Sequence, residues 1–480
     1  MCNGGMKLLP QPYLWAMIER VAPLAISFVV SVIVARMVAP AAYGLVAMLG
    51  MFMALGQAFT ELGFGAALVQ RKEITVDDET TVFVINIVAG LIITAVLCAI
   101  SPLIALFMHQ EILTQLLCAQ SLGILLASTG LVQFAKLSRQ MNFRLGAVIE
   151  MAATIASGLV GITMARAGLG VWSLVGLGLS RELVRAVAAW TLVGWRPSGR
   201  FSKARAASMW AYSGRLLYSS IIHRVVTNLY SILIGRIYAP AALGLYTRAI
   251  GLQSLPTGLM VGIVQRVAFP MYSRNQDDRA LLLRTLRRQV RLLVLATSAT
   301  MGLLAAVAGD LVPWLLGNRW AGAVPLLEIL CIAGVLSATF PLHSQMTMAL
   351  GESRTFLRVE LLKKVAILIV LASVYRFGLV AFAWGAVATS LCDYCLSAWP
   401  TTRLLNYSWR MQLADTAPAV LLCGVPAILL TIVSLSYSWT APALMSAKSL
   451  LLGAVIGGGI LFLRGSYFRD AWDVLHLRQA

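Results

Sequence analysis

The sequence predicts an all-α protein, a polytopic membrane helix bundle of about 14 transmembrane helices. Of its 480 residues, 59% are hydrophobic and 12% are charged, with a mean hydropathy of +0.83. That leaves too little polar surface to cover a water-soluble globule. Apolar runs such as residues 82–108 exceed the length of barrel strands. A third observation is internal: Arg36–Leu45 recurs at Arg236–Leu245, an offset of 236 − 36 = 200, with seven of ten residues identical.

Charge clusters and Pro/Gly positions divide the chain into fourteen spans of about 20 to 28 residues. The predicted spans begin near Tyr13, Tyr43, Thr81, Ile112, Ala147, Leu169, Ser208, Leu243, Arg291, Val324, Phe356, Leu379, Leu413 and Ala441.

Cations gather in every second connection between these spans, which by the positive-inside rule places those connections in the cytoplasm. Both termini are then cytoplasmic and the number of helices is even. The start of the chain has no cleavage-site pattern, so we expect the first helix to remain in the mature protein. The clusters include Arg71 and Lys72 after the second span, Arg284, Arg287 and Arg288 after the eighth, and Lys363 and Lys364 after the tenth.

The repeated decamer predicts two tight outer hairpins, one in each half of the chain. In each copy, Pro40 or Pro240 stops the preceding helix and Gly44 or Gly244 loosens the start of the next. A weaker echo, Arg166 to Leu169 against Arg376 to Leu379, extends the repeat. We therefore predict a six-helix lobe at 1–200, a second at 201–410 and an extra helix pair with a cytoplasmic tail at 411–480. Units with an even number of helices are parallel repeats, which can enclose a cavity.

The connection Ser273 to Arg291 is long, basic and amphipathic, with Leu281, Leu282, Leu286 and Val290 on one side. Two interpretations stay open for it. It is either an interfacial helix on the anionic inner leaflet or a solvated linker whose charges set the topology.

Ionisable residues within the predicted spans are functional candidates, because an unpaired charge in hydrocarbon is costly. Arg181 and Arg185 share a helix face, and Glu182 reaches Arg185 at a spacing of three, which leaves one guanidinium without a local acid. For each candidate, a structural ion pair or a snorkelling side chain is the alternative. The predicted substrate-binding residues are Arg224, Arg181, Arg185, Arg248 and Asn228, and the predicted ion-coupling residues are Asp393, Glu61 and Glu182.

Within the spans the cations outnumber the acids, so the sequence predicts a cavity for an anion. A guanidinium suits phosphate, since its planar fork pairs two oxygens and stays charged. His223 and His343 are more typical of structural residues than of a proton relay. The net charge of +19 follows the membrane topology and does not indicate nucleic acid. Cys392 and Cys395 form a CxxC inside an apolar run, and no nucleotide loop is visible. We expect a non-enzyme with no catalytic residue, metal or cofactor.

Several segments resemble the polysaccharide transporter family, the Wzx-type flippases of the multidrug/oligosaccharidyl-lipid/polysaccharide superfamily, and especially the colanic-acid and succinoglycan exporter-like branch. They are Val34 to Lys72, Met141 to Arg144, Gly168 to Leu174 and Trp195 to Pro197. The resemblance implies two six-helix lobes in a V with a central cavity. It also implies export of undecaprenyl-diphosphate-linked oligosaccharide repeat units across the bacterial inner membrane, for exopolysaccharide or O-antigen assembly.

The partners that follow are the polyprenyl-diphosphate-linked oligosaccharide, membrane lipids, and a polymerase and chain-length regulator of the same pathway. Three alternatives stay open. A cation-coupled multidrug exporter of the same superfamily would favour an acid-rich cavity. The others are a peptidoglycan lipid-precursor flippase and a membrane glycosyltransferase or polymerase.

Overall fold

The protein is described by a computed structural model that covers residues 11–60, 65, 68–69, 73–434 and 446–454. Every regular element in these ranges is helical. The chain divides into two compact units, Met1–Gly244 and Leu245–Ala480. The predicted lobe boundary near residue 200 concerns an internal duplication, which this division does not test, and it stays a prediction.

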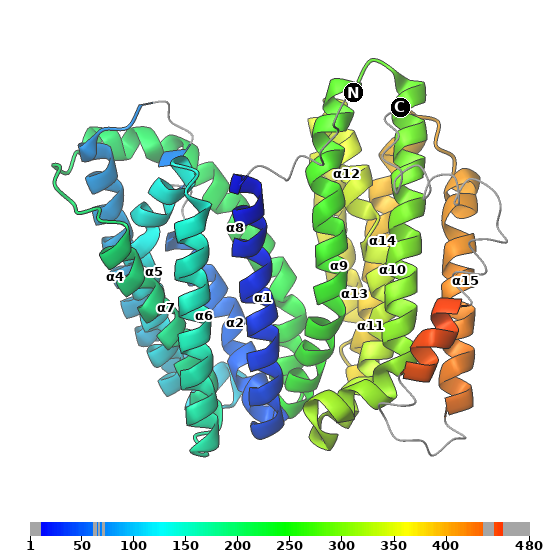
Figure 1. Cartoon of the computed structure of the whole chain (residues 1–480), viewed down its shortest axis with the longest axis horizontal. Coiled ribbons are helices and arrows are strands. Elements are labelled where there is room, and N and C mark those ends of the chain that lie inside the picture. Colours follow the sequence, from blue (N-terminus) through cyan, green and yellow to red (C-terminus); the bar gives the residue numbers. More distant parts are fainter. Residues whose placement is uncertain (1–10, 61–64, 66–67, 70–72, 435–445, 455–480) are drawn as a thin grey trace, which may run out of the picture. The chain divides into compact units, whose positions relative to one another are not determined.

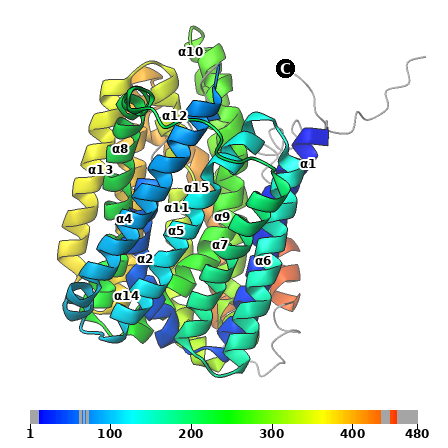
Figure 2. The same ribbon diagram turned by 90° about the vertical axis from the view of Figure 1, so that its left-hand side faces the viewer.

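Among the residues that the structure describes, unit 1 holds seven long helices, of which α4, α5, α6 and α7 run alongside one another (Figures 1 and 2). The helix α1 packs on α6, and α8 packs on α2 and α4. The elements are α1 (Gln11–Met37), α2 (Pro40–Thr60), α4 (Val76–Met108), α5 (Ile112–Arg139), α6 (Phe143–Arg166), α7 (Val171–Leu192) and α8 (Lys203–Ile237).

Unit 2 is built around α10, which packs against α11 and α15, while α14 packs against α11, α12 and α13. The helix α9 starts five residues before the boundary and continues into this unit. The elements are α9 (Pro240–Arg274), α10 (Arg279–Leu316), the 3-10 helix η1 (Asn318–Ala323), α11 (Val324–Ser337), α12 (Phe340–Ala349), α13 (Ser353–Val374), α14 (Leu379–Leu404) and α15 (Trp409–Ser434).

The helices confirm the predicted class, a polytopic helical membrane bundle. Thirteen of the predicted spans coincide with long helical segments, and the fourteenth with helix at 446–454 as far as the chain is described there. The described helices fall into two groups, those apolar enough to cross a membrane and those that are too short or carry too much charge to qualify. Eight segments of the described residues are long and apolar enough to cross a membrane: Pro40–Ala58, Val76–Met108, Ile112–Arg139, Phe143–Arg166, Arg279–Leu316, Asn318–Ala349, Leu379–Leu404 and Trp409–Leu430.

The two copies of the repeated decamer pack against each other through their glycines. A Cβ placed on Gly44 would lie 1.7 Å from the carbonyl oxygen of Pro240, and one on Gly244 would lie 2.0 Å from that of Pro40. The contact is reciprocal, and all four residues belong to unit 1. These glycines are therefore required for close backbone approach, which adds to the loosening role that the sequence predicts.

The segment that joins α7 to α8 is tied to the start of α4. Trp195 Nε1 donates to Glu79 Oε2 at 2.5 Å, Gly199 N to Thr80 Oγ1 at 3.0 Å and Ser202 N to Thr81 Oγ1 at 3.1 Å. The start of α4 is itself fixed by a capping box between Thr75 and Asp78. These bonds hold the start of α8 against the start of α4, within unit 1.

The amphipathic stretch at 279–291 is the first part of α10, and its apolar side faces the protein. Leu282, Leu286 and Val290 are almost fully buried, in one core with Tyr272 and Met346. Both interpretations of this stretch, a helix lying on the membrane and a solvated linker, are therefore wrong. Amphipathicity shows that a face is covered and does not show what covers it.

Prediction: Gly44→Ala lowers the free energy of unfolding by about 1–3 kcal/mol, because the new methyl group meets backbone that cannot rotate away. Gly50→Ala is the matched control, since nothing lies within 4 Å of a Cβ there. It should be neutral, or up to about 1 kcal/mol more stable, as Ala favours a helix over Gly. Denaturation of both purified variants in detergent checks this. Equal stability of the two variants would show that the hairpin contact is not tight.

Candidate functional site

Glu150 on α6 is the centre of a charged cluster in unit 1. Its Oε2 lies 3.3 Å from Arg181 Nη2, and its Oε1 lies 2.8 Å from Arg185 Nε. Arg185 Nη1 is also 3.7 Å from Glu182 Oε2. The pair predicted from spacing, Glu182 with Arg185, is present but is the longest of the three contacts. The guanidinium that was expected to lack a local acid is paired with an acid of a neighbouring helix, Glu150.

The cluster lies well inside the helices. At a rise of about 1.5 Å per residue, Arg181 is about 15 Å from the Val171 end of α7, near the middle of this 22-residue helix. Glu150 is about 11 Å from the Phe143 end of α6 by the same reckoning. The contacts bring Arg181, Arg185 and Glu182 together at a depth where charge must be paired or wet.

A cavity of about 420 Å³ opens beside this cluster, between α2, α5 and α7. Arg185 and Glu182 line it, together with Gln57 and Ser128. The Arg185 guanidinium carbon lies 4.2 Å from the centre of the Phe134 ring, a contact that fixes the guanidinium at the cavity wall. The wall of the cavity therefore contains a cation, Arg185, a carboxylate, Glu182, and an amide, Gln57, beside apolar side chains.

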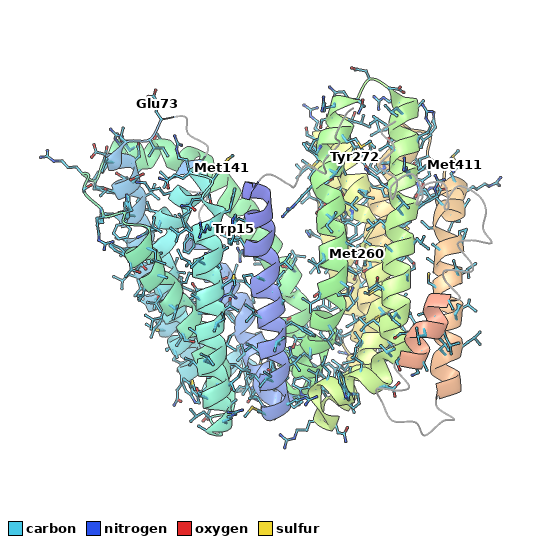
Figure 3. The ribbon with its side chains drawn as sticks, in the orientation of Figure 1. Trp15, Glu73, Met141, Met260, Tyr272 and Met411 are labelled. Carbon is cyan, nitrogen blue, oxygen red and sulfur yellow. The ribbon has the colours of Figure 1, made fainter. Side chains whose placement is uncertain are left out.

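A third carboxylate, Glu19 of α1, belongs to the same region. Its side chain lies over Gly146, where an added Cβ would be 2.4 Å from Glu19 Oε1, and its charge interacts with that of Glu150. Figure 3 shows Trp15 of α1 and Met141 of the α5–α6 turn toward the same end of unit 1. With every group ionised, the cluster holds two positive and three negative charges. The predicted excess of cations is therefore not found in this cluster.

Arg224 and Asn228 lie on α8, which packs on α2 and α4. Asn228 Nδ2 donates to the Arg224 carbonyl oxygen at 2.8 Å, so the amide is engaged with its own helix. The Arg224 side chain is half-buried, about 20 Å from the Ile237 end of α8. The side chain of His223 lies outside the described residues. A binding role for Arg224 and Asn228 stays a prediction.

Arg248 lies in unit 2, on α9, about 12 Å from its Pro240 end. Its guanidinium carbon is 5.4 Å from the ring centre of Trp320, which is fully buried in η1. The contact is a cation–π interaction. It places Arg248 beside the connection between α10 and α11, and a substrate role stays a prediction.

The predicted ion-coupling residues lie in different places. Glu61 lies outside the described residues, and Glu182 is in the cluster of unit 1. Asp393 is on α14 in unit 2, where Oδ1 is buried without a hydrogen-bond partner among the described residues and the carboxylate interacts with Lys363 and Lys364. Their coupling role stays a prediction.

Lys363 was expected in a cytoplasmic connection, and the structure corrects this. It lies in the middle of α13 with 4% of its side chain exposed. Its Nζ donates to Glu360 Oε1 at 2.6 Å and lies 4.9 Å from the centre of the Phe340 ring. Charge counting along a sequence cannot separate such a buried cation from one that sets topology.

Asp415 on α15 is the centre of an ion-pair network that the sequence did not predict. It accepts Arg287 Nε at 2.7 Å and Arg287 Nη2 at 3.0 Å, and Arg291 Nη1 at 3.4 Å. Tyr407 Oη donates to it at 2.8 Å. Burial raises the pKa of Tyr407, and the negative charge of Asp415 raises it further, so the phenol stays protonated and donates. Arg287 was grouped with the topology-setting cations, but it ties α10 to α15.

His343 adjoins this network. The fully buried ring lies between Tyr407, stacked at 6.1 Å, and Tyr394, edge-on at 5.9 Å, and Nδ1 is 2.9 Å from Thr401 Oγ1. These contacts join α12 to α14 and fit the structural role predicted for this histidine. In Figure 3, Tyr272 of α9 and Met411 of α15 lie toward the same end of unit 2.

Many membrane-spanning helices and charged groups buried between them are typical of a multi-pass transporter, and comparison with known proteins agrees. Residues 33–325 match the sequence profile of the family described as polysaccharide biosynthesis protein. The chain belongs to this family.

Two curated relatives extend the match. The teichuronic acid biosynthesis protein TuaB of Bacillus subtilis is 24% identical over 417 residues, which is 85% of this chain and 84% of TuaB. The lipopolysaccharide biosynthesis protein WzxC of Escherichia coli is 26% identical over 329 residues, 67% of this chain and 66% of WzxC. These relatives confirm the resemblance that the sequence segments carry.

The fold is similar to that of a solved lipid II flippase, MurJ, in an inward closed conformation. The TM-score is 0.71 at 13% sequence identity, with 94% of this chain and 99% of the MurJ chain covered. At this identity the likeness concerns the fold. It supports the polytopic helical bundle as the architecture of the chain.

Prediction: Asp415→Asn lowers the free energy of unfolding by about 1.5–3 kcal/mol, since it removes the buried carboxylate that accepts from Arg287, Arg291 and Tyr407. The exposed Asp277→Asn serves as the control and should stay within about 0.5 kcal/mol of the parent. Urea titration in detergent measures both. If the two variants unfold alike, the Asp415 network does not stabilise unit 2.

Proposed function

We propose that this protein is a flippase that moves polyprenyl-diphosphate-linked oligosaccharide repeat units across the inner membrane of a bacterium, for polysaccharide assembly. The family match over residues 33–325 carries the proposal. The names of TuaB and WzxC assign those proteins to the biosynthesis of teichuronic acid and lipopolysaccharide. A lipid-linked sugar must cross the membrane before such polymers can leave the cell, and a multi-pass helical bundle suits that step.

The charged cluster of unit 1 supports the choice of substrate. Arg181 and Arg185 present two guanidiniums about halfway into the helices, beside a cavity with polar and apolar walls. Each guanidinium can pair two phosphate oxygens, and Gln57 and Ser128 suit a sugar. We assign the diphosphate to this cluster, with Arg224, Asn228 and Arg248 as further binding residues at other steps of the movement.

The remaining parts of the proposal concern ion coupling, membrane topology and partners. Asp393, Glu182 and Glu61 are proposed to couple an ion to transport, which proceeds by alternating access. Both chain ends are proposed to face the cytoplasm, and the partners to be membrane lipids and the polymerase and chain-length regulator of the same pathway. The protein is proposed to act without enzymatic chemistry.

Two other transport functions are tested against this one. A cation-coupled multidrug exporter would favour organic cations and a cavity dominated by acids. A peptidoglycan lipid-precursor flippase would carry one lipid-linked muropeptide. Transport of several lipid-diphosphate sugars in proteoliposomes, with an organic cation dye as competitor, separates the three.

Prediction: Arg185→Gln reduces flipping about 10- to 100-fold, because a charge-assisted hydrogen bond contributes about 1.5–3 kcal/mol. The assay is loss of fluorescence when dithionite reaches a labelled farnesyl-diphospho-hexose in proteoliposomes. Arg358→Gln, an exposed arginine on α13, is the control and should flip at the parental rate. Parental activity of a well-folded Arg185→Gln would remove the cluster from the substrate path.

Prediction: Arg224→Ala reduces polymer export in the native bacterium while the protein is still made and inserted. Export is measured as polymer on the cell surface, and insertion as membrane-extracted protein. The physical reason is the loss of a half-buried cation within α8, which is costly to place there unless it has a role. Normal export by the variant would mean that Arg224 is structural.

A further inference from the structure

Glu150 occupies the position beside Arg181 and Arg185 that the proposed function assigns to the diphosphate. Its carboxylate lies 3.3 Å from Arg181 and 2.8 Å from Arg185, so both guanidiniums are engaged before any substrate arrives. An anion that uses the same two guanidiniums has to displace it. Both partners of the exchange are oxygen anions of similar reach, so the competition is direct.

One of the two ion pairs that Glu150 would lose, the pair with Arg185, lacks hydrogen-bond geometry. The 2.8 Å contact with Arg185 is an ion pair without hydrogen-bond alignment, and Arg185 Nε is a buried donor with no hydrogen-bond partner among the described residues. Glu182 Oε2 is likewise a buried acceptor without one. Arg185 Nε therefore keeps an unused donor at the cavity wall, which a better-shaped anion would accept, whereas Glu182 Oε2 is an acceptor and offers an anion no partner.

The charge balance decides what happens to Glu150 after displacement. The groups that face it are Glu19 on α1, and Arg181, Glu182 and Arg185 on α7; Arg144, on its own helix, lies over Trp15. The adjacent parts of α2 and α5 contribute Gln57 and Phe134, which do not titrate. A disubstituted diphosphate adds two negative charges to the three carboxylates. Five negative charges beside two positive ones favour protonation of a carboxylate, and the carboxylate that is displaced from both guanidiniums is the one that loses its ion pairs.

We infer that Glu150 is a proton-coupling residue: a diphosphate headgroup displaces its carboxylate from Arg181 and Arg185, and the freed carboxylate takes up one proton. This inference rests on the proposed function and names a residue outside the predicted ion-coupling set. One O–H bond forms on a Glu150 oxygen and one breaks in a hydronium ion or buffer acid of the bulk solution, while two ion pairs are exchanged for two guanidinium–phosphate pairs. Substrate binding and proton uptake are then one event, and release of the headgroup returns the proton.

The experiment is titration calorimetry of the full chain in nanodiscs with a farnesyl-diphospho-hexose. This probe is disubstituted, so its phosphates do not titrate near neutral pH. Repeating the titration in two buffers of different protonation enthalpy gives the number of protons taken up. We expect about one proton per ligand in the parent, and an affinity that falls up to about tenfold per pH unit as pH rises.

Glu150→Gln should bind with no proton uptake and no pH dependence, because the amide fills the same space and cannot titrate. Glu182→Gln should still take up a proton, and Glu111→Gln, an exposed control at the start of α5, should match the parent. Binding without proton uptake by the parent overturns the inference and leaves the proposed function standing. Proton uptake that persists in Glu150→Gln also overturns it. If the parent does not bind the probe at all, the proposed diphosphate site itself fails. If Glu150→Gln does not fold, Glu19→Gln and Glu182→Gln decide: proton uptake retained in both supports Glu150, and uptake lost in either overturns the inference.

Discussion

A charge inside a membrane-spanning helix needs a partner, and that constraint organises both units of this protein. In unit 1, Glu150 forms ion pairs with two arginines of α7. In unit 2, Asp415 forms ion pairs with Arg287 and Arg291. The two sites differ in their surroundings. Asp415 is 4% exposed and also accepts the Tyr407 phenol, whereas Glu150 is 17% exposed and its partner Arg185 lines a cavity. The first arrangement suits permanent structure, and the second suits exchange.

The fold could be predicted from the sequence because helix period, apolar length and breakers are local properties. Partners of charged side chains are not local. Glu182 and Arg185 lie three residues apart and were paired from spacing alone, but Arg181 meets Glu150 across 31 residues and Arg287 meets Asp415 across 128. Which turns of two helices face each other depends on the packing of every side chain between them. The excess of cations predicted for the site was counted without these partners.

The repeated decamer is a second case in which the sequence predicts local structure but not the contacts between distant residues. Its recurrence indicates duplication, and its Pro and Gly residues predict hairpins. That Gly44 meets Pro240 while Gly244 meets Pro40 follows only from the three-dimensional arrangement. The two copies of the hairpin therefore pack backbone against backbone within unit 1. The bonds from Trp195, Gly199 and Ser202 to the start of α4 fix the other end of α8.

The central claim is that the arginine pair of unit 1 holds Glu150 in the absence of substrate and a diphosphate in its presence. An electron cryomicroscopy structure of the chain in nanodiscs with a farnesyl-diphospho-hexose tests it directly. The account predicts phosphate density beside Arg181 and Arg185, with the Glu150 carboxylate turned away from both. Density for the diphosphate elsewhere, with the Glu150 ion pairs intact, would contradict it.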